Sequence, residues 1–394
     1  MDRRIFLRSG ITGAAGIMAF PSSIASPGSK EQEGSIIYRT LGKTGMKIPV
    51  ISFGVMRSDN PNLCKAAYEK GIKLFDTANV YLNGNSETML GNLFKDYPRD
   101  TFFLATKVKP EGADKNGRPT AETTTEAFLK TFDDSISKIK TNYVDILYVH
   151  NLTNPEMLEH KPIINAVKKL KKDGRVKFVG FSTHSNEAAL INAAAGNETW
   201  DVILTSYNFK QTYISELQTA IRKASAGGIG IVAMKTMAGG GFLDKEKSKP
   251  INSTAALKWV LSNPDITTTI PGMTDFDQVE KNVKILTDIT LSEEEKNDLI
   301  IAGTETGLYC TACSKCIPAC PKNLPVPEMM RAYMYAYGYS DPRMAYSLLN
   351  ELKSGENPCS GCKSCVIKCT KEFNIKEKIA DISRLVNVPL DFLA

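Results

Sequence analysis

The chain has 394 residues, of which 42% are hydrophobic and 23% are charged. This balance is ordinary for a folded globular protein and excludes a largely disordered chain. The net charge of +6 is modest and spread along the sequence. Its densest run, the lysine-rich stretch at 168–172, fits a solvated helix face, so nucleic acid is not an expected partner.

The first 26 residues differ from the rest of the chain. Residues 2–8, DRRIFLR, closely resemble a twin-arginine export signal, and an apolar stretch at 11–20 and a small-residue site at 23–25 follow. About ten apolar residues cannot span a hydrocarbon layer of about 30 Å, so no stable membrane span is expected in the mature form. We interpret residues 1–26 as a twin-arginine signal peptide and expect a periplasmic bacterial protein. The alternatives are an ordinary secretory signal or a disordered tail, and the protein is cytoplasmic if the signal interpretation is wrong.

Strand-like and helix-like segments alternate between residues 35 and 303. This alternation is typical of a parallel sheet covered by helices, and eight such units are what a (β/α)8 TIM barrel needs. The predicted strands are 50–53, 74–76, 102–106, 144–150, 178–182, 202–207, 229–234 and 267–270. The clearest predicted helices are 124–140, 155–172, 187–194 and 254–262.

Four polar residues lie at or just after the ends of these strands. Asp76 ends the second strand, Tyr81 lies in the loop after it, and Lys107 and His150 end the third and fourth strands. In a TIM barrel, catalytic groups gather at the carboxyl ends of the strands. A tyrosine has an ordinary pKa of about 10, which a neighbouring ammonium lowers. The pattern therefore predicts a proton donor at Tyr81, tuned by Lys107 and Asp76, with His150 orienting a carbonyl oxygen.

The same segments resemble the aldo-keto reductase superfamily. The resemblance is carried by FDTANVY at 75–81 with GNSE at 84–87, TK at 106–107, DILYVH at 145–150 and the opening YRTLGKTG at 38–45. It covers roughly residues 36–285. It implies transfer of a hydride between a nicotinamide cofactor, NADP or NAD, and a small carbonyl or alcohol substrate. Tyr81 would be the general acid.

The resemblance also implies contacts with the cofactor. Ser182 would hold the carboxamide and Tyr207 would stack on the nicotinamide, while the glycine-rich stretch containing Gly239 and Gly240 would approach the pyrophosphate. Gly272, Gln278 and Asn282 would meet the adenosine end.

Some positions depart from the family pattern. Thr183 and Leu204 stand where many relatives have Asn and Gln. Gly272 and Gln278 replace the basic residues that grip a 2′-phosphate in many members, so the preference for NADP over NAD stays open.

Eight of the nine cysteines fall in the last part of the chain, residues 308–394, in two copies of the pattern C-x2-C-x2-C-x3-C. This spacing predicts two [4Fe–4S] clusters. In such double patterns the fourth cysteine binds the other cluster, so Cys320 is expected with the second set and Cys369 with the first. Zinc and disulfides fit this spacing poorly. The cysteines are Cys310, Cys313, Cys316, Cys320, Cys359, Cys362, Cys365 and Cys369.

The segment between the two cysteine sets favours helices. Asp341 suits a helix N-cap and Pro342 the first helical turn, whereas tyrosines alternate at 333–339 as they would in a strand. We expect a small, mainly α-helical, di-cluster ferredoxin-like domain. The tail is similar to a subgroup of the superfamily that carries a C-terminal ferredoxin-type domain.

Three functions are compatible with the sequence. The leading hypothesis is an exported oxidoreductase whose two [4Fe–4S] clusters relay electrons to a redox partner protein or a quinone-linked acceptor. The alternative is an iron–sulfur electron carrier whose barrel is a non-catalytic docking or sensing module. In the third hypothesis the barrel is an ordinary reductase, and the clusters only stabilise the structure of the C-terminal segment. The substrate, the physiological direction and the oligomeric state do not follow from the sequence.

Overall fold

The computed structural model describes residues 35–238, 251–304 and 310–393. The predicted signal peptide and the predicted pyrophosphate contacts Gly239 and Gly240 lie outside the described residues. Within this part of the chain, no helix is both long and apolar enough to cross a bilayer.

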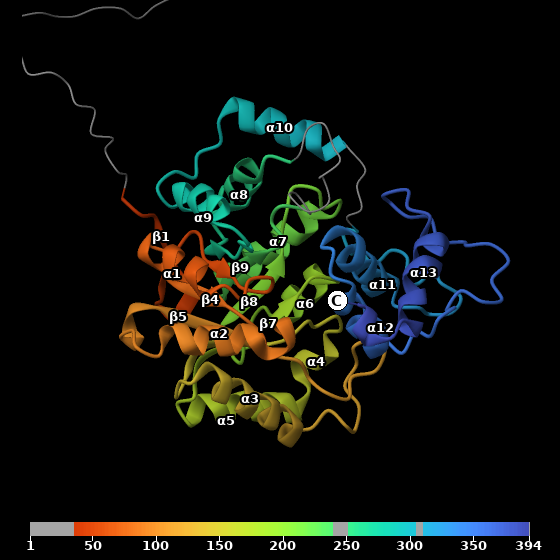
Figure 1. Ribbon diagram of the computed structural model, residues 1–394, viewed down its shortest axis with the longest axis horizontal. Coiled ribbons are helices and arrows are strands. Elements are labelled where there is room, and N and C mark those ends of the chain that lie inside the picture. Colours follow the sequence, from red (N-terminus) through yellow and green to blue (C-terminus); the bar gives the residue numbers. More distant parts are fainter. Residues whose placement is uncertain (1–34, 239–250, 305–309, 394) are drawn as a thin grey trace, which may run out of the picture. The chain divides into compact units, whose positions relative to one another are not determined.

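Eight parallel strands form the centre of the fold (Figure 1), in the order in which they follow along the chain. Ile51 pairs with Thr269 across the gap between the first and last of them, where Ser52 N donates to Thr269 O (2.9 Å), so the sheet curls into a ring. The predicted parallel eight-stranded barrel is confirmed. Its strands are β3 (Phe53–Gly54), β4 (Leu74–Asp76), β5 (Phe103–Val108), β6 (Val144–Val149), β7 (Val176–Thr183), β8 (Val202–Ser206), β9 (Gly230–Met234) and β10 (Thr268–Thr269).

An antiparallel hairpin precedes the barrel, formed by β1 (Tyr38–Thr40) and β2 (Lys47–Pro49). Leu41 and Ile48 from this hairpin are fully buried and belong to the same apolar cluster as the inward-facing residues Leu74, Ile146 and Leu204. The hairpin thus fills the barrel interior from one end, and the polar strand ends lie at the other.

Helices surround the strands (Figure 1), and apolar residues on their inner faces pack against the outside of the barrel. The predicted helix at 155–172 is broken in two at His160, because Pro162 has no amide hydrogen to continue the first segment. The helices are α1 (Pro61–Glu69), α2 (Asn85–Phe94), α3 (Thr125–Ile139), α4 (Glu156–Glu159), α5 (Lys161–Lys172), α6 (Glu187–Ala194), α7 (Ile214–Ala226), α8 (Ser253–Leu261), α9 (Phe276–Val283) and α10 (Glu293–Thr304).

The C-terminal part is helical, as expected, with α11 (Val326–Tyr333), α12 (Pro342–Glu351) and α13 (Ile375–Ser383) packed around their own apolar cluster. Asp341 caps α12, its carboxylate accepting from Met344 N (2.9 Å). A π-helical turn, Met334–Gly338, follows α11. The alternating tyrosines therefore lie on a helix, where residues four apart meet: the rings of Tyr333 and Tyr337 are 4.5 Å apart.

Candidate active site

Asp76 and Lys107 form a buried ion pair at the carboxyl ends of β4 and β5. These strands are hydrogen-bonded neighbours, which brings the two side chains together. Lys107 Nζ contacts Asp76 Oδ1 and donates to Thr77 O (2.7 Å), and both residues are almost fully buried. A buried ammonium needs such a partner, because burial of an unpaired charge is costly.

Tyr81 lies beside this pair in the tight turn that follows β4. Lys107 Nζ is 4.7 Å from the centre of the Tyr81 ring. The ring of His150, which directly follows β6, meets the Tyr81 ring edge-on at 5.9 Å. The structure therefore brings all four predicted residues to one place.

Buried hydrogen bonds fix the loop that carries Tyr81. Ser86, at the start of α2, bonds to Thr77 (2.8 Å) and donates to Val55 O (3.0 Å). Glu87 accepts from Thr106 Oγ1 (2.6 Å) on β5. These contacts hold the first turn of α2 against the strand ends and so fix the position of Tyr81.

Burial dominates the electrostatics of Tyr81 and His150. It raises the pKa of Tyr81, and the Asp76 carboxylate raises it further. From the sequence we expected Lys107 to lower this pKa, but Lys107 is paired with Asp76, which offsets its charge at Tyr81. Burial and the charges of Lys107, Lys109 and Arg331 hold the pKa of His150 well below its usual range. The site therefore presents a protonated phenol and a neutral imidazole.

Ser182 lies at the carboxyl end of β7, where its hydroxyl accepts from Asn151 N (2.8 Å). Ser182 is only 1% exposed, so its hydroxyl lies below the surface at the strand ends. Thr183 donates to Ser185 O (2.9 Å), and Leu204 lies fully buried inside the barrel. The hydroxyl of Thr183 is therefore engaged within its own loop, and Leu204 offers no polar group.

The structure does not bring Tyr207 to the tetrad. Its ring is only 1% exposed and stacks on Trp259 (5.2 Å) between barrel and helices, and its hydroxyl accepts from Gln218 (2.9 Å) and Asn263 (3.2 Å). Stacking on a nicotinamide does not fit this packing, so the expectation for Tyr207 is corrected.

The residues expected at the adenosine end follow β10. An added Cβ at Gly272 would lie 3.7 Å from Gly54 O, so the backbone there is open to approach. Gln278 accepts from Thr274 N (2.9 Å) and donates to Asp275 (2.6 Å), and Asn282 is buried on α9. Gly272 and Gln278 are partly exposed and therefore accessible to a ligand, and neither residue carries a charge.

Sequence reasoning missed the contribution of α11 to this site. Arg331 lies with Nη1 2.6 Å from His184 Nε2 and 3.2 Å from Asn151 Oδ1, and it pairs with Glu328. Glu328 in turn accepts from Ser185 (3.2 Å). The only sequence signal was an oppositely charged pair three residues apart on a helix.

The tyrosines after α11 lie close to the same site. Burial raises the pKa of Tyr335 to about 12, and Tyr81 is among the groups whose charge acts on it. Arg57, in the loop after β3, donates to Tyr339 O (2.7 Å) and stacks on its ring. The C-terminal segment thus borders the carboxyl ends of the barrel strands.

Lys235 directly follows β9 and also lies here. Burial and the charge of Arg331 lower its pKa to about 7. Lys235 lines a pocket together with His184, Cys310, Glu328 and Arg331. Its position just after an apolar strand was the signal that could have identified it.

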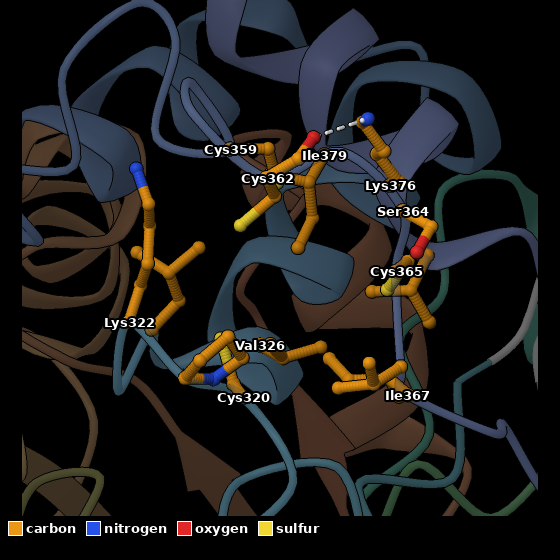
Figure 2. A pocket seen from close by; sticks show the side chains of 14 residues that line it. Cys320, Lys322, Val326, Cys359, Cys362, Ser364, Cys365, Ile367, Lys376 and Ile379 are labelled. Carbon is orange, nitrogen blue, oxygen red and sulfur yellow. Dashed lines mark hydrogen bonds between the residues drawn. The ribbon is translucent and has the colours of Figure 1, made fainter.

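The eight C-terminal cysteines are free thiols that gather in two sets. Cys320, Cys359, Cys362 and Cys365 line one cavity (Figure 2). Burial raises the pKa of Cys310 to about 12, and the neighbouring thiols of Cys316, Cys313 and Cys369 raise it further. The fourth cysteine of each motif thus lies with the other motif's first three.

Within the described residues, no group of three or more His, Cys, Asp or Glu side chains is close enough to hold a single metal ion.

The chain is similar to several curated proteins over its barrel region. It is 28% identical over 305 residues to an L-galactose dehydrogenase of Arabidopsis thaliana, covering 65% of this chain and 92% of that protein. It is 24% identical to an L-glyceraldehyde 3-phosphate reductase of Escherichia coli, covering 72% and 98%.

Solved structures share the fold. An aldo-keto reductase of Bacillus halodurans superimposes with a TM-score of 0.55 at 20% identity, over 71% of this chain and 99% of that one. An aldo-keto reductase of Klebsiella pneumoniae, solved with NADPH, gives 0.53 at 22% identity, over 68% and 95%. The sequence model of the Aldo/keto reductase family matches residues 52–255. The chain belongs to the aldo/keto reductase family of NAD(P)-dependent oxidoreductases.

Proposed function

We propose that this oxidoreductase interconverts a small carbonyl compound and its alcohol at Tyr81 and His150. The observation that carries the proposal is the arrangement of the tetrad: a protonated phenol and a neutral imidazole face each other beside the Lys107–Asp76 pair. Two neutral donors at one point can polarise a carbonyl oxygen.

In the reducing direction, the carbonyl oxygen accepts hydrogen bonds from Tyr81 Oη and from a ring N–H of His150. The nicotinamide supplies the hydride when bound. As negative charge develops on the oxygen, Tyr81 donates its proton. Burial and Asp76 raise the pKa of Tyr81, whereas the charge of Arg331 opposes them and stabilises the phenolate that remains. Burial lowers the pKa of Lys107, and the Asp76 carboxylate opposes that shift. In the oxidising direction the same groups remove the proton of the alcohol.

The residues present fit a nicotinamide cofactor. The Ser182 hydroxyl, already oriented by Asn151 N, can donate to the carboxamide. The accessible backbone at Gly272 and the amide of Gln278 suit the adenosine end. Gly239 and Gly240 keep their proposed role at the pyrophosphate.

We also infer that residues 308–394 form a ferredoxin-type domain that follows the barrel at 35–303. Cys320, Cys359, Cys362 and Cys365 would hold one [4Fe–4S] cluster, and Cys310, Cys313, Cys316 and Cys369 the other. The shared cavity of the first set and the mutual proximity of the second support this assignment. The clusters would supply one-electron transfer when bound.

The position of Cys310 supports an electron path between the two parts. Cys310 lines the same pocket as His184, at the end of β7, and Lys235, after β9. The first cysteine set therefore lies against the end of the barrel that holds the tetrad. Two one-electron centres match the two electrons of a hydride, and a redox protein or a quinone-linked acceptor would take them onward.

The test is anaerobic titration of the full-length protein with NADPH and, separately, NADH, following nicotinamide fluorescence, cluster absorbance and spin signals. Reduction of the clusters by either nucleotide supports the electron path. Nucleotide binding without cluster reduction leaves the reductase and makes the clusters structural or dependent on another donor. If neither nucleotide binds, the reductase proposal fails and the iron–sulfur carrier takes its place.

We also propose that residues 1–26 direct export of the protein by the twin-arginine route. The twin-arginine route carries folded proteins, so clusters inserted in the cytoplasm would survive transfer to the periplasm. A reporter fused to residues 1–26 should be exported by a bacterial host, and the double substitution R3K/R4K should abolish this. Export that persists in a host without the twin-arginine translocase would contradict it.

A further inference from the structure

A pocket between α11 and the ends of β7 and β9 is lined by two basic side chains and one carboxylate. Arg331 and Lys235 are its cations, and Glu328 is the only carboxylate among the residues that line it. Arg331 and Glu328 are both less than a tenth exposed. Charges this well shielded from water need compensating partners.

The cations are incompletely paired. Arg331 Nε is buried without a hydrogen-bond partner, although its Nη atoms contact His184, Asn151 and Glu328. Lys235 Nζ makes no hydrogen bond or ion pair within the described part of the chain, and its nearest recorded aromatic contact is Tyr335, at 6.0 Å. The ammonium group therefore has free donors at the pocket wall.

His184 accepts from Arg331 and does not compensate the charge of Lys235. Burial and the charges of Arg331 and Lys235 hold its pKa well below its usual range, so it is neutral, and it accepts from the Arg331 guanidinium. Glu328 is already engaged by Arg331 and Ser185. Among the described residues that line the pocket, Lys235 Nζ and Arg331 Nε are thus the basic donors without a hydrogen-bond partner.

The pocket adjoins the tetrad. The charge of Arg331 acts on both Tyr81 and His150, the two donors for the carbonyl oxygen. Asn151, which accepts from Arg331, is the residue next to His150. Arg331 thus connects the pocket wall to the residue that follows His150.

We propose that Arg331 and Lys235 bind an anionic oxygen group, a carboxylate or a phosphate, on the carbonyl substrate. This inference rests on the proposed function and narrows its substrate to short acidic aldehydes or ketones. Arg331 Nε and the Lys235 ammonium can each donate to one oxygen of such a group, and the lysine is the more mobile of the two. The C-terminal segment then has a direct part in substrate selection.

The test compares matched substrates in the intact protein: succinic semialdehyde against butanal for the carboxylate, and glyceraldehyde 3-phosphate against glyceraldehyde for the phosphate. One charged substrate should exceed its neutral partner by roughly 10- to 100-fold in kcat/KM, the range of a charge-assisted hydrogen bond. The pair that shows the larger ratio identifies the anion. Equal values in both pairs overturn the inference while leaving the reductase function intact.

K235M should reduce this ratio by about tenfold or more, mainly through the KM of the charged substrate. The control is K130M, which removes an exposed lysine from α3 and should leave the ratio unchanged. If K235M keeps the ratio but raises the KM for the nucleotide, or shifts the potential of a cluster, Lys235 serves the cofactor or the cluster and the inference is wrong.

A binding measurement separates the two proposals if no aldehyde is reduced. Succinate or inorganic phosphate should raise the melting temperature of the wild-type protein, and less so that of K235M. That result would keep the anion site while the reductase proposal fails. No shift with either anion would overturn the anion site.

Discussion

Arg331 on α11 lies with Nη1 2.6 Å from Nε2 of His184 at the end of β7, although 147 residues separate them in the sequence. A guanidinium can only donate, so the imidazole nitrogen accepts and His184 is neutral. This contact ties the cysteine-rich part of the chain to the end of the barrel where Tyr81 and His150 lie. Helix α11 therefore contacts the strand end beside the tetrad.

Removing the hydroxyl group of Tyr81 should greatly slow carbonyl reduction. Y81F keeps the ring against His150 but has no hydroxyl to donate, and general acid catalysis of this kind contributes roughly 10²- to 10⁴-fold. We expect kcat/KM to fall within that range, with unchanged nucleotide binding measured by fluorescence. Y38F, at an exposed position of the hairpin, is the control. Activity of Y81F within a few-fold of wild type would contradict the assignment.

Glu187 should make the protein less stable as pH rises toward neutrality. Burial raises its pKa to about 7, although Ser206 and Tyr213 donate to it. An unfolded glutamate titrates near 4.3. Between these values the folded state binds more protons than the unfolded state, so the free energy of unfolding falls as pH increases. This stabilisation is present at low pH and is lost as the pH passes through about 7.

E187Q isolates this effect, because glutamine cannot ionise and keeps an acceptor oxygen. Between pH 5.5 and 8 the wild type should lose about 2 kcal/mol of unfolding free energy relative to E187Q. Anaerobic urea titrations at both pH values measure the difference. E198Q, which alters an exposed carboxylate, should show no such dependence. Parallel pH profiles for wild type and E187Q would contradict the prediction.

Double substitutions should show that the two cysteine sets are crossed. C310S/C369S removes two ligands of one set and should leave about half of the iron and one intact cluster. C310S/C320S removes one ligand from each set and should lower the iron content and the visible absorbance of both clusters. If the sets are not crossed, the two variants exchange behaviour. Iron analysis and spin resonance of anaerobically purified protein distinguish the outcomes.

The barrel and the tetrad could be predicted because both depend on local sequence. Apolar runs mark the strands, and Asp76, Lys107 and His150 come directly at or after them. The shared edge of a parallel sheet then brings them together. Tyr207 was misplaced because one residue beyond a strand decides which face a side chain takes, and periodicity does not fix where the strand ends.

Arg331 could not be predicted for a different reason. Its role depends on how α11 packs against the ends of β7 and β9, and that packing joins residues far apart in the chain. The pKa of Tyr81 could not be predicted for the same reason, because it also depends on packing between distant residues. The sequence placed a lysine nearby but could not show that Asp76 offsets its charge or how deeply the phenol is buried.

The preference between NADPH and NADH should respond to position 278. Gln278 bonds to Thr274 and Asp275 and carries no charge that could pair with a 2′-phosphate. In Q278R, a guanidinium there should form a charge-assisted hydrogen bond with that phosphate, raising the ratio of kcat/KM for NADPH over NADH roughly tenfold. Q278L removes the amide without adding charge, so it separates the effect of the new charge from loss of the bonds to Thr274. An unchanged ratio in Q278R would show that the 2′-phosphate binds elsewhere, and the adenosine end would then need to be assigned to other residues.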